Sequence, residues 1–218
     1  MRRNKHGLVA FAAALSIIFF AGEASAVKKI TGNAEAGAIT SALCQGCHGG
    51  DGNSEDGSFP RLAGQYADYI AKQVFDFQKG HRANNDTMAG MAAMVASVQD
   101  AKDIGAYFAA QPMSDKPITD IDKKLAKEGE SIYINGNPKS GVYGCVNCHG
   151  PRGHGKASDI SVFPRIGGQH RFYIAKQLKD FRAGTRANDP AGMMADIAKK
   201  LTDDEIAAVS EYLAAQLP

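Results

Sequence analysis

The pentapeptide CQGCH occupies residues 44–48, and the pentapeptide CVNCH occupies residues 145–149. Together they contain all four cysteines of the 218-residue chain. Four cysteines in an exported chain would ordinarily form two disulfides, but a disulfide has no need of a histidine after each pair. Cys-x-x-Cys-His is instead the attachment signature of c-type haem, in which the thiols bond the porphyrin and the histidine binds the iron.

The signature therefore predicts two haem c groups. The predicted attachment residues are Cys44, Cys47, Cys145 and Cys148, and the predicted proximal iron ligands are His48 and His149. One zinc site made of four thiolates is an alternative, although such a site does not need His after both pairs. A thioredoxin-like redox pair would expect alternating strands and helices, which are missing. A chance match is plausible once but not twice at matching places in a repeat.

The sequence around each pentapeptide is indeed repeated, at an offset of 101 residues that grows to 104 further along the chain. The matching blocks are FPR at 59–61 and 163–165, YIAKQ at 69–73 and 173–177, and RAN at 82–84 and 186–188. Pro112 and Pro117 interrupt any helix between the copies. We therefore expect two domains, at residues 27–112 and 121–218, joined by a linker at 113–120.

The first 26 residues have the three parts of a secretory signal peptide. Residues 1–6 are basic, residues 8–21 are apolar except for Ser16, and residues 24–26 form a small-residue cleavage site. The apolar run is too short to span a bilayer comfortably, so we expect cleavage before Val27 and export from the cytoplasm. An uncleaved membrane anchor is the alternative.

Cleavage removes three of the 25 Lys and Arg and one of the 23 Asp and Glu, which leaves 22 of each. A neutral chain lacks the basic excess that a nucleic-acid partner would require, so no such partner is expected.

Apolar residues recur at helical spacing in both copies, and convincing alternating strands are absent. The expected helices run over residues 33–44, 65–80 and 100–110 in the first copy, and over 122–133, 169–184 and 203–215 in the second. Thr202 and Glu205 form a capping box before the last of them. Domains this small usually need a staple, and a covalently held haem supplies one. The predicted fold class is all-α, with two tandem cytochrome c-like domains each wrapped around one covalently bound haem.

The duplicated unit resembles the cytochrome c4 family of bacterial periplasmic dihaem cytochromes. Four motifs carry the resemblance: Cys-x-x-Cys-His, Phe-Pro-Arg-x-x-Gly-Gln, Tyr-Ile-Ala-Lys-Gln, and Arg-Ala-Asn-Asx ahead of methionines. The match covers nearly the whole chain after the signal peptide. It implies that each iron has His on one side and Met on the other, and that the protein works in the periplasm.

The methionine ligands implied by the resemblance lie in two clusters. In the first copy the candidates are Met88, Met91 and Met94, and the family's Met-x-Gly-Met pattern on residues 88–91 favours Met88. Met88 stands nine residues before Ser97, one more than the family's spacing, so Met91 remains an alternative ligand. In the second copy the candidates are Met193 and Met194.

Met194 stands eight residues before Thr202, which is the family's spacing, and it is therefore preferred over Met193. The alternative role for any one of these methionines is to line the pocket, since Met fills irregular apolar gaps.

Two prolines and two arginines are candidates for supporting roles. Pro60 and Pro164 follow the proximal histidines by 12 and 15 residues, where a carbonyl can accept a hydrogen bond from the His ring. Arg61 and Arg165 could bind haem propionates at the domain interface, or could be solvated surface. The same two possibilities hold for Gln65 and Gln169.

Three further histidines have no counterpart in the other copy, so we expect them at the surface. They are His81, His154 and His170.

The resemblance implies an electron-transfer protein that is not an enzyme. It would carry electrons between a bc1-type respiratory reductase and a terminal oxidase, free or loosely associated with the membrane. An alternative is the dihaem electron-accepting subunit of an enzyme similar to flavocytochrome c sulfide dehydrogenase. A dihaem peroxidase or thiosulfate dehydrogenase would need an open or unusual iron ligand, whereas this sequence offers methionines in both copies and no spare Cys.

Overall fold

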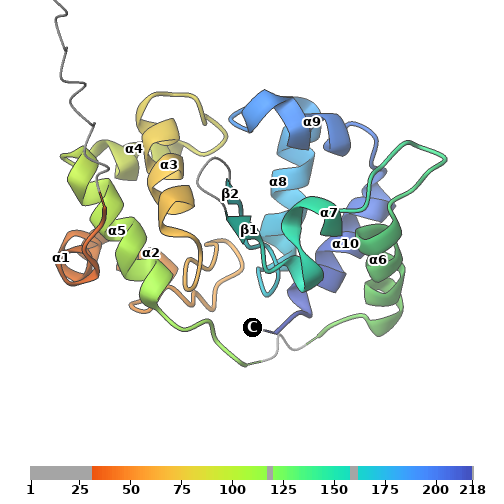
Figure 1. Ribbon diagram of the computed structural model, residues 1–218, viewed down its shortest axis with the longest axis horizontal. Coiled ribbons are helices and arrows are strands. Elements are labelled where there is room, and N and C mark those ends of the chain that lie inside the picture. Colours follow the sequence, from red (N-terminus) through yellow and green to blue (C-terminus); the bar gives the residue numbers. More distant parts are fainter. Residues whose placement is uncertain (1–30, 117–119, 158–161, 218) are drawn as a thin grey trace, which may run out of the picture.

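Two groups of helices lie side by side in the computed structural model, which describes residues 31–116, 120–157 and 162–217 (Figure 1). The first group contains α1 (Ala34–Thr40), α2 (Ala42–His48), α3 (Ala67–Gln78), α4 (Asp86–Ala93) and α5 (Val98–Ala110). The second contains α6 (Lys123–Asn135), α7 (Val146–His149), α8 (Arg171–Ala183), α9 (Met193–Ala198) and α10 (Asp203–Ala214). The signal peptide expected at residues 1–26 lies outside the described residues, and the domain boundaries stay predictions.

The all-α fold class is confirmed, with one small exception. The strands β1 (Lys156–Ala157) and β2 (Val162–Phe163) pair antiparallel in the second group, and the sequence did not predict them. None of the described helices is both long and apolar enough to cross a membrane.

Helix ends follow the capping signals where these were present in the sequence. The capping box is formed, because Glu205 N–H donates to Thr202 Oγ1 at 3.2 Å and Thr202 N–H donates to Glu205 Oε2 at 2.8 Å. Gly184 ends α8 in the left-handed conformation, with φ of 76°. Thr and Glu favour a capping box, and glycine favours the left-handed conformation at the end of a helix, whatever surrounds them.

The prediction of one helix over residues 33–44 was wrong, because the chain turns at Ser41 and starts a second helix there. Ser41 is fully buried, and its hydroxyl accepts a hydrogen bond from Gln45 Nε2 at 2.9 Å. The same Gln45 nitrogen donates to Ala38 O at 3.0 Å, so a side chain satisfies a carbonyl that a continuous helix would bond to a backbone N–H. The turn gives α2, which carries the first pentapeptide, a direction of its own.

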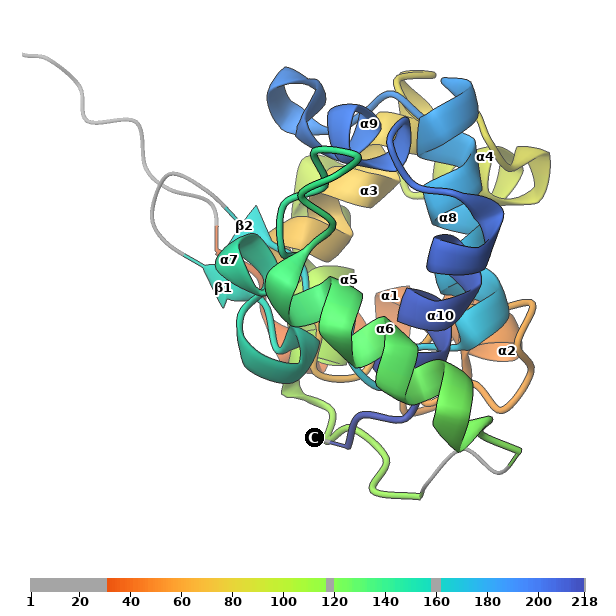
Figure 2. The same cartoon turned by 90° about the vertical axis from the view of Figure 1, so that its right-hand side faces the viewer.

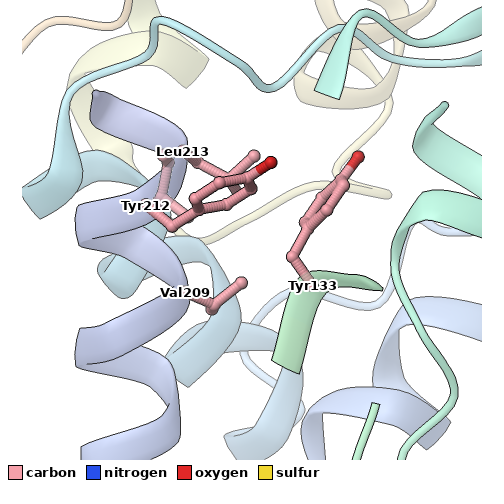
Figure 3. Close-up of a cluster of buried hydrophobic side chains, with 5 residues drawn as sticks. Tyr133, Val209, Tyr212 and Leu213 are labelled. Atoms are coloured by element: carbon pink, nitrogen blue, oxygen red, sulfur yellow. The ribbon is translucent and has the colours of Figure 1, made fainter. Parts of the chain in front are cut away.

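In each group the first helix crosses the last helix at a glycine. A Cβ added at Gly37 would lie 2.0 Å from Asp103 O of α5, and one added at Gly129 would lie 1.9 Å from Ala208 O of α10. The two backbones therefore touch at these points, and only glycine fits. Beside the second crossing, the Tyr133 ring of α6 faces the Tyr212 ring of α10 with centroids 5.2 Å apart (Figure 3).

We expect Gly129→Ala to lower the free energy of unfolding of the haem-loaded protein by about 2 to 3 kcal/mol, since the added methyl overpacks the crossing. Gly46→Ala is the matched control, because a Cβ at Gly46 meets nothing within 4 Å. That change should leave stability the same or raise it by up to about 1 kcal/mol, since alanine favours a helix interior over glycine. Guanidinium unfolding followed by circular dichroism measures the free energy of unfolding of both variants. Equal values for Gly129→Ala and Gly46→Ala would contradict the close crossing.

Candidate functional site

Each pentapeptide ends in a buried histidine whose ring is held by a proline carbonyl. His48 is 5% exposed and its Nδ1 lies 2.8 Å from Pro60 O, while His149 is 6% exposed and its Nδ1 lies 2.9 Å from Pro164 O. A carbonyl oxygen can only accept, so Nδ1 carries the proton in both rings. The lone pair of Nε2 is then free to bind a metal.

The surroundings of the two histidines match closely. The Phe59 ring meets the His48 ring edge-on at 6.2 Å and 74°, and the Phe163 ring meets the His149 ring at 6.3 Å and 76°. Burial lowers the pKa of both imidazoles, against the smaller opposite effect of the proline carbonyl. Both rings are therefore neutral at neutral pH.

The four cysteines are free thiols in the structure, half-buried at Cys44 and Cys145 and exposed at Cys47 and Cys148. Burial raises the pKa of the Cys44 thiol, and it raises that of Cys145 to about 11, so both stay protonated. Within the described part of the chain, no three His, Cys, Asp or Glu side chains group together to hold a metal.

Exposure separates some of the candidate methionines. Met194 is half-buried whereas Met193 is 41% exposed. In the first copy Met94 is 58% exposed, while Met88 and Met91 are both half-buried. Met88 packs against a buried cluster of Val74, Phe77, Ala92 and Ala101. The ligand roles of Met88 and Met194 stay predictions.

Apolar side chains border the first cysteine of each pair. Cys44 packs against a cluster of Ile70, Ile104 and Phe108. Cys145 packs against a cluster of Tyr133, Ile174, Val209, Tyr212 and Leu213, most of which Figure 3 labels. Each copy thus combines two thiols, a neutral and oriented imidazole and apolar surface, and it has a half-buried methionine on another helix of the same group, Met88 on α4 and Met194 on α9. This is the donor set that suits a covalently attached haem with His and Met ligands.

Reciprocal hydrogen bonds join the two helical groups next to these sites. Gln65 Nε2 donates to Arg165 O at 2.7 Å, and Arg165 N–H donates to Gln65 Oε1 at 3.0 Å. Gln169 makes the same pair of bonds with the backbone of Arg61, both at 2.9 Å. The glutamines therefore bind the other group's backbone, and the propionate role of Arg61 and Arg165 stays a prediction.

A second reciprocal network lies between the groups, and the sequence did not predict it. Arg82 Nη2 donates to Tyr173 Oη at 3.1 Å, and Arg186 Nη2 donates to Tyr69 Oη at 3.1 Å. Both guanidiniums are buried, at 5% exposed, and they stack on Phe77 and Phe181. The signal was present in the sequence, because these polar residues occur in both copies although a solvated surface has no need to repeat them.

The expectation of a surface position is wrong for His170, which is 8% exposed between the two groups. Its Nε2 lies 2.9 Å from Ser54 O of the first group, so this nitrogen carries the proton and donates. At the matching position of the first copy, Tyr66 Oη donates to His154 O at 3.3 Å. The side chain of His81 is 71% exposed, as expected, and His154 is half-buried.

We expect this buried His170 to make the contact between the groups sensitive to acid. Burial and, to a smaller extent, the guanidinium of Arg61 lower the pKa of His170 below its ordinary 6.5, and the Ser54 carbonyl and Asp56 only partly oppose this. The unfolded chain therefore binds the proton more readily than the folded chain. The stability that His170 contributes is present above about pH 6.5 and is lost as the pH falls toward the lower folded value.

His170→Gln is the matched variant, because glutamine can still donate to Ser54 O but does not titrate. Melting temperatures measured from about pH 7.5 down to about pH 5 should fall more steeply for the wild-type protein than for this variant. Parallel curves would show that His170 protonation does not weaken the contact.

Comparisons with known proteins agree with this site. A protein-family model described as Cytochrome c matches residues 126–216. Cytochrome c4 of Thiocapsa roseopersicina is 45% identical over 84% of this chain and 92% of its own length. The crystal structure of reduced cytochrome c4 from Pseudomonas stutzeri superposes with a TM-score of 0.77 at 39% identity, over 85% of this chain and 100% of that one. A protein of Thiomonas intermedia named thiosulfate dehydrogenase electron acceptor is 37% identical over 80% of this chain and 79% of its own.

Proposed function

Since this chain belongs to the cytochrome c4 family, we propose that it carries electrons in the periplasm from a bc1-type respiratory reductase to a terminal oxidase. As a member of this family, the chain is a dihaem c-type electron-transfer protein, not an enzyme, and its cofactors are two haem c groups. The identity of its redox partners, its export and a loose association with the membrane belong to the proposal.

We assign the cofactor contacts residue by residue. The covalent links are assigned to Cys44, Cys47, Cys145 and Cys148, the proximal ligands to His48 and His149, and the distal ligands to Met88 and Met194. When bound, the haem iron supplies one-electron oxidation and reduction. Pro60 and Pro164 fix the imidazole rings in one orientation, so these ligands need not rearrange when an electron arrives or leaves.

One observation carries the proposal: the same proline-held, neutral imidazole follows a thiol pair in both copies, and reciprocal hydrogen bonds join the copies. A fixed contact between the groups keeps two redox centres at one separation, which suits a relay of electrons within the chain. The exposure of Cys47 and Cys148 supports access to both centres from the surface.

Two experiments test the proposal. Intact mass of the exported protein should equal residues 27–218 plus two haems, which tests cleavage before Val27 and the cofactor content together. Stopped-flow spectroscopy with the purified bc1 complex and with oxidase-containing membranes of the same bacterium should show rapid reduction by the first and rapid oxidation by the second. If the bc1 complex does not reduce the protein and the membranes do not oxidise it, the protein is not this carrier.

The relative from Thiomonas intermedia supports a second candidate, an electron acceptor that serves one dehydrogenase. A solved thiosulfate dehydrogenase from Marichromatium purpuratum has 29% identity and a TM-score of 0.73, and this chain covers 40% of it. In this case, as for the subunit of a flavocytochrome c sulfide dehydrogenase, the protein should copurify with a dehydrogenase. Rapid reduction by that enzyme and none by the bc1 complex would favour this candidate.

A further inference from the structure

Asn188, the last residue of the second RAN block, is held by helix α3 of the first group. Its Nδ2 donates to Asp76 Oδ2 at 2.6 Å and to Gln73 Oε1 at 3.0 Å. Its backbone carbonyl accepts from Lys72 Nζ of the same helix at 2.8 Å. Its Oδ1 accepts from Arg186 Nε of its own copy at 3.0 Å, so both ends of the amide have partners and its orientation is fixed.

Asn84, the matching residue of the first copy, is held by helix α8 of the second group. Its Nδ2 donates to Asp180 Oδ2 at 2.6 Å and to Gln177 Oε1 at 3.1 Å. Its backbone carbonyl accepts from Lys176 Nζ at 3.4 Å, and its Oδ1 accepts from Arg82 Nε at 3.1 Å. The contact is therefore crossed, because each copy holds a segment of the other. The helices that follow these segments, α4 and α9, lie at the same end of the molecule in Figure 1 and in Figure 2.

The residue after each of these asparagines holds the backbone of a methionine to which we assign iron ligation. Asn85 is the N-cap of α4, and its Oδ1 accepts from Met88 N–H at 2.9 Å. Asp189 Oδ2 accepts from Met194 N–H at 2.7 Å and from the N–H of the following residue at 3.1 Å. The N-cap residue of α9, Gly192, has no side chain to do this, so Asp189 fixes the start of the helix from further back in the chain.

The second copy holds its methionine across a strained turn. Ala191 lies between Asp189 and Met194 with φ of 54°, a left-handed conformation that residues other than glycine rarely adopt. Such strain persists only where surrounding contacts impose it, and it is concentrated at ligand clamps and switch regions. The first copy has no residue of this kind between Asn85 and Met88. The position of Met194 therefore depends more on its hydrogen bonds than that of Met88 does.

We propose that each copy positions the distal iron ligand of the other copy, through Asp76 for Met194 and through Asp180 for Met88. The inference rests on the proposed function, because it takes these two methionines as the ligands. Without the Asp76 carboxylate, the Asn188 amide loses its shortest bond to α3, and the neighbouring residue that holds Met194 N–H loses its support. Groups that orient a metal ligand from behind strengthen its bond to the metal. Asp76 and Asp180 are therefore positioning residues, which act through the asparagines.

Proton magnetic resonance of the reduced, haem-loaded protein tests the proposal. The methyl group of each methionine ligand gives its own resonance, shifted by the ring current of the haem, and Met88→Ala and Met194→Ala assign the two. Asp76→Ala should broaden or remove the Met194 resonance and leave that of Met88 in place. Asp180→Ala should do the reverse, with a smaller effect. Carbon monoxide binds ferrous iron only where the methionine has left, so Asp76→Ala should bind it about tenfold faster at one of the two centres.

Asp76→Asn is the conservative control, because its amide oxygen still accepts from Asn188, and it should keep the wild-type resonances. A local disturbance of packing would act on the nearer centre, since Met88 packs against a cluster that includes two residues of α3. A change at the Met88 resonance alone in Asp76→Ala, equal changes at both resonances, or unchanged spectra would each overturn the proposal.

The assignment variants separate this failure from that of the proposed function. If Met194→Ala removes one shifted resonance and Asp76→Ala leaves it unchanged, the positioning role alone fails. If Met194→Ala leaves both resonances in place, Met194 is not a ligand, and the ligand set of the proposed function fails together with the positioning role.

Discussion

Replacing Cys145 and Cys148 together with alanine is expected to leave the purified protein with one haem c in place of two. Without the thioether links, only the ligand bonds and packing would hold the second haem. The cluster of Tyr133, Ile174, Val209, Tyr212 and Leu213 packs against Cys145, so the second helical group would also lose contacts next to its core. Intact mass and the haem absorbance per chain measure this result.

The mirror variant, with Cys44 and Cys47 replaced by alanine, is the control for this experiment. It should lose the other haem and leave the second group folded, because each copy has its own apolar cluster beside its cysteines. A small domain without its staple has little core, so the altered group in either variant should become sensitive to protease. Retention of two haems by either variant would contradict attachment at these cysteines.

The sequence predicted the parts of this molecule that depend on local signals. The two pentapeptides located both candidate sites, and Thr202 with Glu205 located the start of α10. Residue type alone determines these features, because a capping box acts within one turn of helix. The break at Ser41 was not predictable in the same way, since the apolar spacing continues across it and the contacts that bury this serine form only in the folded chain.

The contacts between the two copies could not be predicted from the sequence either. His170 has no counterpart in the first copy, and a single polar residue at the start of a helix gives no sign of what will cover it. In the structure it is buried because Ser54 of the other group lies against it. Arg82 and Arg186 were visible as repeated residues, but their crossed bonds to Tyr173 and Tyr69 require the relative placement of two domains.

The methionine ligands were only partly predictable from the sequence. The sequence locates each cluster, but neighbouring methionines can only be distinguished by the direction of each side chain. Successive residues on a helix point about 100° apart, so Met193 and Met194 of α9 cannot both face the same iron. Met194 is the less exposed of the two, and it is also the one that the family's spacing favours. Exposure does not separate Met88 from Met91, since both are half-buried, and only the family's Met-x-Gly-Met pattern favours Met88.

We expect Met194→Ala to keep both haems attached while lowering the reduction potential of the second centre and removing its sulfur-to-iron absorption. A thioether ligand stabilises ferrous iron, and axial ligands tune haem potentials over a range of about 0.8 V, so the shift should be large in a redox titration. Met193→Ala is the matched control, because it removes the same side chain from a position that is 41% exposed. If Met193→Ala removes the absorption and Met194→Ala does not, the ligand assignment must be exchanged. If neither variant loses the absorption, the distal ligand of the second centre is not in this cluster. The same measurements on Met88→Ala and Met91→Ala identify the distal ligand of the first centre.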